Sequence, residues 1–149
     1  MTPNLSDLYR QVILDHSQHP RNFGSLDGAV AVALKNPACG DEVTLFLDVA
    51  DGVIQRAAFE GHGCSISMAS ASMLTELILR RPLEEALHLN REFRRLLQTG
   101  QADDPDALGD LEVLVGVKQF PARIKCALLS WNALEQAIEG IDGTGGNPP

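Results

Sequence analysis

The stretch that decides the fold is residues 59–73, Phe-Glu-Gly-His-Gly-Cys-Ser-Ile-Ser-Met-Ala-Ser-Ala-Ser-Met. An apolar, strand-like segment ends in two glycines, and a cysteine and a helix of small residues follow directly. A strand that enters a helix through a glycine-rich turn places the Cys64 sulfur near backbone N–H groups that have no partner within the helix. Because the positive end of the helix dipole lies at the same point, the position favours a thiolate over a thiol. Cys64 is therefore the first candidate functional residue.

The other two cysteines also have unusual neighbours. Cys39 lies in the turn-like segment Asn-Pro-Ala-Cys-Gly-Asp at residues 36–41, and the carboxylate of Asp41 follows two residues later. Cys126 comes early in the last predicted helix, whose apolar stripe includes Ile124. At about 100° per residue, Cys126 lies about 200° from Ile124, so we expect it on the side of the helix opposite the packing stripe. We infer that the fold brings three sulfurs and one carboxylate together.

Hydrophobic periodicity predicts an α+β fold, with a three-stranded antiparallel sheet and helices packed mainly on one face. Apolar residues alternate over residues 43–49, as expected of a half-buried strand. Asp51-Gly52 is a hairpin signal, because both central positions of a type I′ turn take positive φ. The flanking strands are expected at residues 30–34 and 53–59, the second with Val53, Ala57 and Phe59 on one face.

The helices follow from apolar residues at a spacing of three and four. Pro82 suits the first turn of a helix, and Gly100 suits its end. The segment 108–117 is apolar enough to pack but gives no clear element type. Helices are predicted over about residues 6–17, 64–80, 82–99 and 121–140.

The bulk properties of the chain limit its function. A length of 149 residues predicts one domain over residues 1–140, with a disordered Gly- and Pro-rich tail at 141–149. The net charge of −8 argues against nucleic acid and anionic membrane surfaces, whose binders carry a basic face. No apolar run is long enough to predict a membrane-spanning helix. An odd number of cysteines and the lack of a signal peptide favour a reducing cytoplasm.

Three thiolates and one carboxylate suit tetrahedral Zn²⁺, and the same set also suits an iron–sulfur cluster. The carboxylate is the harder and weaker ligand for a soft metal, which favours an exchangeable site. His62, between two glycines, is either a rival fourth ligand or an exposed turn residue. A further alternative stays open at this point, because cysteine is often a small buried apolar residue with no other role.

Three segments resemble the signatures of a known family. Residues 36–41 and 59–72 resemble the first two signatures of the IscU/NifU-like family, and residues 121–126 resemble the third. The similarity extends from Leu8 to Ile138, so the resemblance covers nearly the whole chain. The fold that it implies is the same α+β fold that periodicity predicts.

Two departures from the family pattern point to one branch. Lys125 stands where the iron–sulfur scaffold members have a histidine. The chain between the last two cysteines is also longer than in those scaffolds, with the excess in residues 81–106. Both features are similar to the SufU branch, which is found with the cysteine desulfurase SufS.

The resemblance implies a metal site and a sulfur acceptor. Members of the branch bind zinc and take sulfur from the desulfurase persulfide, so zinc is expected on Cys39, Asp41, Cys64 and Cys126. Cys39 is the expected acceptor, because its loop contains glycine and adjoins the weaker ligand, whereas the other two cysteines are tied to helices. Arg123 lies in the third motif, and it is expected either to neutralise the anionic site, to help the partner dock, or to be an ordinary surface residue.

The resemblance also implies partners. They are a cysteine desulfurase of the SufS type and downstream proteins of iron–sulfur cluster assembly. The chain would then act as a second substrate of the desulfurase rather than as a stand-alone catalyst. The alternative is a scaffold on which an iron–sulfur cluster is assembled, with the cluster in place of zinc.

Overall fold

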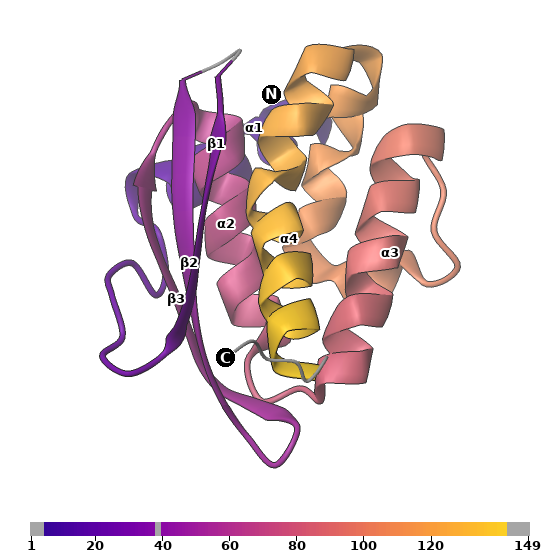
Figure 1. Ribbon diagram of the computed structural model, residues 1–149. Coiled ribbons are helices and arrows are strands. Elements are labelled where there is room, and N and C mark those ends of the chain that lie inside the picture. Colours follow the sequence, from indigo (N-terminus) through magenta and orange to yellow (C-terminus); the bar gives the residue numbers. More distant parts are fainter. Residues whose placement is uncertain (1–4, 38–39, 143–149) are drawn as a thin grey trace.

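One antiparallel sheet organises the fold, with its strands in the order β1-β2-β3. A computed structural model of the chain describes residues 5–37 and 40–142. The strands are β1 (Val30–Asn36), β2 (Asp41–Ala50) and β3 (Val53–His62) (Figure 1). Asp51 and Gly52 join β2 to β3 with φ of 55° and 74°, the positive values that a type I′ hairpin needs. The predicted sheet is therefore confirmed.

The central strand β2 supplies the middle of the buried face. Val43, Leu45 and Leu47 are buried, while Thr44 and Phe46 between them are half-buried on the other face. This alternation is the period of two that the sequence shows. It fixes the register of the sheet, because a slip of one residue would turn the apolar side chains to solvent.

The return strand β3 departs from the prediction at one residue. Ala57 and Phe59 are buried as expected, but Val53 is only half-buried and Ile54 is in the core instead. The pairing of β2 with β3 shifts register after Asp48. An extra residue in one strand turns the side chains beyond it to the opposite face of the sheet. At the start of β3, Ile54 therefore faces the core in place of Val53.

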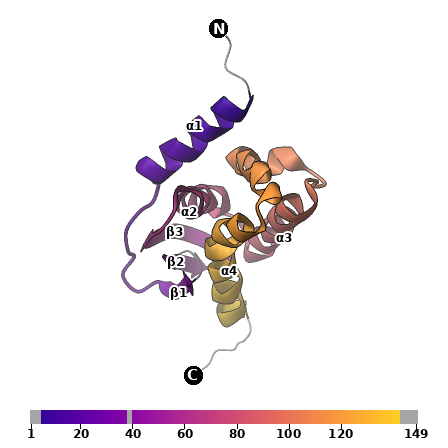
Figure 2. The ribbon, with the colours of Figure 1, turned by 90° about the horizontal axis from the view of Figure 1, so that it is seen from above.

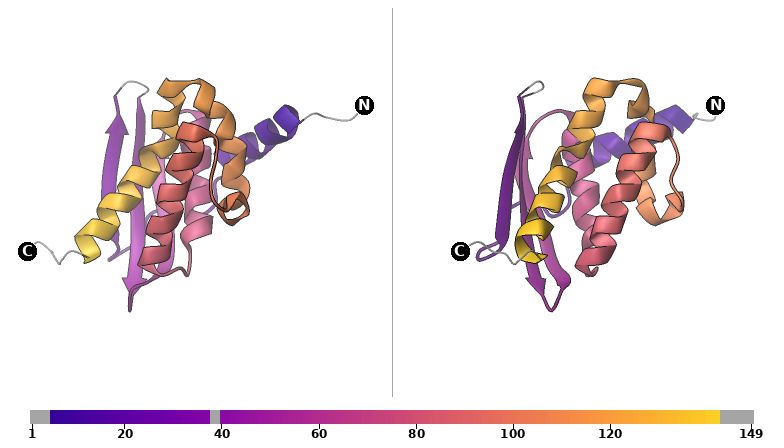
Figure 3. Two further views of the ribbon diagram at one scale, coloured as in Figure 1. Left: turned by 90° about the vertical axis from the view of Figure 1, so that its right-hand side faces the viewer. Right: turned by 45° about the vertical axis from the view of Figure 1, so that its right-hand side comes forward.

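The helices cover one face of the sheet, as predicted. The helix α2 (Ser65–Ile78) packs on β3, and α4 (Pro121–Asp142) packs on β1 and β2 (Figure 1 and Figure 3). A further layer outside them contains α3 (Leu83–Thr99) and the 3-10 helix η1 (Pro105–Gln119). Viewed from above, α1 (Leu5–Gln18) lies on the side of α2 away from the sheet (Figure 2), and it also contacts η1.

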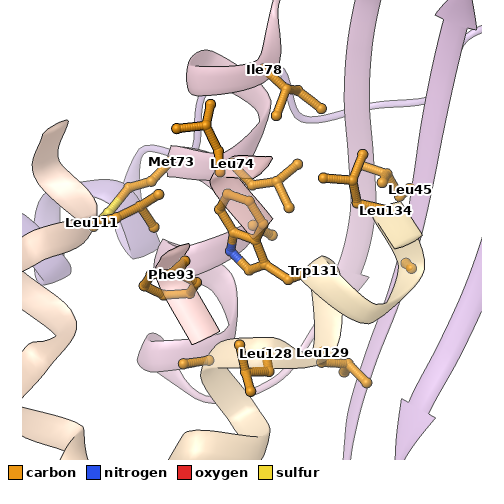
Figure 4. Packing of buried hydrophobic residues seen from close by; sticks show 14 of the residues in the cluster. Leu45, Met73, Leu74, Ile78, Phe93, Leu111, Leu128, Leu129, Trp131 and Leu134 are labelled. Carbon is orange, nitrogen blue, oxygen red and sulfur yellow. The ribbon is translucent and has the colours of Figure 1, made fainter. Parts of the chain in front are cut away.

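A serine hydroxyl in the core joins α2 to α4 by two buried hydrogen bonds. Trp131 of α4 is fully buried among the residues of Figure 4, with its ring centroid 5.0 Å from that of Phe93. The indole Nε1–H donates to Oγ of Ser70 at 3.1 Å, and that hydroxyl donates to the Ala127 carbonyl at 2.6 Å. These bonds satisfy the indole N–H and the Ser70 hydroxyl, and they tie the two helices together.

The position of Cys126 on α4 corrects a prediction. The sequence places Cys126 away from the packing stripe of its helix, yet only 1% of it is exposed. The physical reason is that α4 lies between the sheet on one side and α2 and α3 on the other. A helix enclosed in this way buries residues around most of its circumference, so a single stripe does not describe it.

The unassigned segment 108–117 belongs to η1. Leu108, Leu111, Leu114 and Val117 are its buried residues. Gly109, with φ of 57° and ψ of −133°, interrupts the helix, and after this break the spacing of three from Leu111 to Val117 is the period of a 3-10 helix. Gly100 ends α3 with φ of 82°, which confirms the predicted stop. The predicted tail at 141–149 lies outside the described residues except for its first two residues, which are helical because α4 continues to Asp142. Over the described ranges, no helix combines the length and apolar character needed to cross a membrane.

Candidate metal site

The site lies where β2, α2 and α4 begin, at the upper end of the molecule in Figure 1. Asp41 is the first residue of β2, and its side chain is completely buried. Its Oδ1 accepts a hydrogen bond of 2.9 Å from the Cys64 backbone N–H. Its Oδ2 lies 3.9 Å from the Cys64 sulfur. A buried carboxylate needs such partners, because taking its charge out of water is costly.

Cys64 is the N-cap residue of α2. Its φ and ψ are −70° and 166°, and its Sγ accepts the backbone N–H of Ser67 at 3.4 Å. The sulfur therefore occupies the place that a serine or aspartate oxygen usually takes at a helix start. The prediction that Cys64 lies at the N-terminus of this helix is confirmed, and its side chain is half-exposed.

Gly63 is needed for the approach of Asp41 to Cys64. A Cβ atom added at Gly63 would lie 2.4 Å from Oδ1 of Asp41. Any side chain would displace the carboxylate from the position where it meets the Cys64 N–H. The sequence shows the glycine pair around His62, but not that the second glycine makes room for a carboxylate.

Cys126 reaches the site from the second turn of α4. Its Sγ lies 3.9 Å from Nδ2 of Asn36, which donates to it, and 3.7 Å from the Ala122 carbonyl. Asn36 is the last residue of β1 and pairs with Asp41 in the sheet register. Sequence analysis missed Asn36, although it opens the motif that contains Cys39.

The three groups converge on one point. A carboxylate oxygen of Asp41 and the sulfurs of Cys64 and Cys126 all lie within 4.8 Å of one another. Tetrahedral zinc with Zn–S bonds of about 2.3 Å holds two sulfurs about 3.8 Å apart. Two cysteine sulfurs and a carboxylate therefore match three of the four ligand positions of a tetrahedral zinc site, at nearly the spacing that zinc needs.

The remaining predicted ligands have different outcomes. Cys39 lies outside the described residues, so its place as fourth ligand stays a prediction. His62 ends β3 beside Glu42, with Nε2 3.2 Å from a Glu42 oxygen and a side chain that is 72% exposed. In the sheet register His62 pairs with Glu42, and Asp41 points to the opposite face. Among the described residues, the metal-ligating cluster therefore leaves His62 out.

Arg123 lies beside the two sulfurs, in the first turn of α4. The negative charges of the Cys64 and Cys126 thiolates raise the pKa of its guanidinium above the ordinary value, and hydrogen bonding to the same sulfurs acts in the same direction. Its side chain is exposed, so this electrostatic effect is screened by solvent. Arg123 thus places a positive charge beside the sulfurs of Cys64 and Cys126.

Lys125 takes no part in the ligand cluster. It is exposed on α4 and lines a small cavity of about 310 Å³ together with Lys35 and Asn36. An ammonium group has no lone pair to offer a metal, so Lys125 adds a positive charge and no ligand.

Comparison with known proteins gives a consistent assignment. The sequence profile of the NifU-like N-terminal domain matches residues 8–127. The chain is 49% identical over 140 residues to the zinc-dependent sulfurtransferase SufU of Bacillus subtilis, covering 94% of this chain and 95% of that protein. It is 44% identical over 135 residues to the iron–sulfur cluster assembly scaffold protein IscU of Streptococcus pyogenes, covering 91% and 85%.

A solved structure is similar to this chain in both fold and sequence. It belongs to a candidate iron–sulfur cluster assembly scaffold protein for the SUF system, from Fervidobacterium islandicum. The TM-score is 0.81 at 36% sequence identity, and the match covers 86% of this chain and 94% of that one. The α+β architecture with its helices on one face of the sheet is therefore a known fold.

Proposed function

The chain belongs to the NifU-like N-terminal domain family, and on this premise we propose that it is a zinc-dependent sulfur acceptor in iron–sulfur cluster biogenesis. It takes sulfur from the persulfide of a cysteine desulfurase of the SufS type. One observation carries the proposal: Asp41, Cys64 and Cys126 meet within 4.8 Å. The 49% identity to a zinc-dependent sulfurtransferase supports the same assignment.

Four residues would hold the metal. They are Asp41, Cys64 and Cys126, with Cys39 as the fourth ligand two residues before Asp41 in sequence. Bound zinc supplies a positive charge that keeps the thiols deprotonated and offsets the cost of bringing several anions together. Asn36 and the Ser67 N–H each donate to one of the sulfurs, which is the support that outer partners usually give to metal ligands.

Cys39 is the proposed sulfur acceptor. Its thiolate attacks the outer sulfur of the donor persulfide and forms a new S–S bond, while the S–S bond of the donor breaks. The electron pair of the broken bond leaves with the donor cysteine as a thiolate, so the transfer is neutral in redox terms. Cys64 and Cys126 are less suited, because the first caps α2 and the second is buried in α4.

Arg123 is the proposed auxiliary residue. It stands beside two thiolates and is exposed, so it faces the direction from which a partner must approach. A persulfide is anionic, and a guanidinium at the entrance attracts it. After the transfer, downstream proteins of cluster assembly receive the sulfur. The reduced thiols that the reaction needs favour the cytoplasm as its compartment.

The experiment that tests this function combines metal analysis with desulfurase kinetics. We expect about one zinc and negligible iron per chain after purification without added metal, which is the count that one four-ligand site predicts. Zinc-loaded protein should raise the turnover of the desulfurase with cysteine as substrate, whereas chelated protein and the Cys39→Ala variant should not. Iron with acid-labile sulfide, and transfer of an intact cluster to an apo-acceptor, would instead support the scaffold function.

A further inference from the structure

A groove opens beside Cys64 and runs along α1. It consists of two adjoining cavities of about 550 and 410 Å³. Both are lined by Ile13 of α1, Ser65 and Ile66 of α2, and Val113 and Gly116 of η1. The first cavity ends at Cys64 and Phe120, and the second ends at Arg10. We call this surface the α1–η1 groove.

The α1–η1 groove is open to solvent although its walls are largely apolar. Ile13, Ile66 and Val113 are only half-buried in it. Phe120 at its mouth is 59% exposed, and its backbone N–H donates to the Val117 carbonyl at 2.8 Å, which holds the residue at the rim. Contiguous apolar surface of this kind marks an interaction site, whereas a single exposed apolar residue would not.

The charge of the groove is opposite in sign to that of the chain. The whole chain carries a net charge of −8. Apart from Cys64, which would be held by the metal, the charged residues among the described lining of the groove are Arg10 and Arg123, and both are cationic. Two guanidinium groups at the ends of an apolar groove complement a segment that combines apolar side chains with anionic groups.

We propose that the α1–η1 groove binds the segment of the desulfurase that carries the persulfide, an inference that rests on the function proposed above. The anionic persulfide lies at the Arg123 end, next to Cys64, and apolar residues of the same segment pack on Ile13, Val113 and Phe120. An acidic group further along the segment faces Arg10. The groove thereby determines which sulfur donor can reach the metal site.

Gly116 allows a clean test, because it lines both cavities and a Cβ added there meets no atom within 4 Å. Gly116→Glu adds a negative charge inside the groove, and Gly116→Lys adds a side chain of similar length with a positive charge. Gly140 on α4 is the matched control, because its Cβ also meets no atom within 4 Å and it does not line either cavity. Gly140→Glu and Gly140→Lys therefore repeat the same changes outside the groove.

The measurement is the Kd of each zinc-loaded variant for the desulfurase, with zinc content and desulfurase turnover measured in parallel. We expect Gly116→Glu to raise the Kd about tenfold or more and Gly116→Lys to raise it by less, since only the first opposes an anionic segment. Both Gly140 variants should bind like the unaltered chain, and zinc content should be unchanged throughout. The difference between the two Gly116 variants should shrink at high salt.

Equal Kd values for Gly116→Glu and Gly140→Glu would overturn the groove assignment alone, provided that the unaltered chain still accelerates the desulfurase. An unaltered chain that binds the desulfurase but does not accelerate it would overturn the proposed function, while the Kd series would still test the groove. No binding by the unaltered chain would overturn both. A dimer of this chain that Gly116→Glu dissociates, with desulfurase binding unchanged, would assign the groove to a second copy and contradict the proposal.

Discussion

The helices α2 and α4 meet in two regions, the core and the candidate metal site, and the two contacts are built differently. In the core, Ser70 joins Trp131 and the Ala127 carbonyl by hydrogen bonds of 3.1 and 2.6 Å among apolar side chains. At the site, the contacts of the Cys64 and Cys126 sulfurs are longer, from 3.4 to 3.9 Å, and the two sulfurs face a carboxylate.

The two contacts therefore have different roles: the core contact sets the spacing of the helices, and the site contact brings reactive side chains together. The core contact fixes the distance between the helices with neutral groups that are fully satisfied. The site contact uses that fixed distance to keep two cysteine sulfurs and one carboxylate within 4.8 Å of one another. Variants of the core should therefore change the free energy of unfolding, whereas variants of the site should change metal affinity.

The largest effect is expected for Trp131→Ala. Truncation of this fully buried ring leaves a cavity against Phe93 and removes the hydrogen bond to Ser70, so the free energy of unfolding should fall by about 3–5 kcal/mol. Denaturant titration of the metal-free protein measures this loss. Trp131→Phe is the control, because it keeps a ring but still lacks the N–H, and it should cost less. A Trp131→Ala variant with unchanged stability would contradict the role given to the core contact.

The next effect is expected for Gly63→Ala. The new methyl group would occupy the place of Asp41 Oδ1, so zinc affinity should fall about 100-fold, at the upper end of what support residues contribute. Competition with a chelator of known affinity gives the value. Gly140→Ala makes the same change in open space and should leave zinc affinity unaltered. If both variants bind zinc equally well, Gly63 is not needed for the approach of Asp41.

The smallest effect is expected for Asn36→Ala. The variant removes the amide that donates to the Cys126 sulfur, and zinc affinity should fall about tenfold. The same chelator competition applies, with Lys35→Ala as the control for a change at the neighbouring exposed residue. The distinction between core and site is supported if Asn36→Ala lowers zinc affinity but lowers the free energy of unfolding of the metal-free protein less than Trp131→Ala does.

Much of the fold could be predicted because its signals are local. The alternation in β2, the Asp51-Gly52 hairpin and the stop at Gly100 each depend on a few neighbouring residues. The burial of Cys126 could not be predicted, because it depends on elements that enclose α4 from several sides. The 3-10 helix η1 gave only a spacing of three, which fits neither of the two periods used to recognise helices and strands.

In the candidate site too, some features could be predicted from neighbouring residues and others depend on the three-dimensional packing. Asp41, Cys64 and Cys126 could be proposed from residue type and motif, and the structure brings them together. The contributions of Asn36 and Gly63 depend on strand register and on the space beside a carboxylate. The α1–η1 groove depends on the packing of α1 against η1, two segments about one hundred residues apart in the chain.

The central claim is that Cys39 of the zinc-loaded chain accepts the sulfur, and sulfur mapping tests it most directly. The zinc-loaded chain would be incubated with the desulfurase and cysteine, alkylated, digested and examined by mass spectrometry for the cysteine that carries an additional sulfur. We predict persulfide on Cys39 in the zinc-loaded chain and little on Cys64 or Cys126. Persulfide mainly on Cys64 or Cys126, or none on any cysteine of a zinc-loaded chain that binds the desulfurase, would contradict the account.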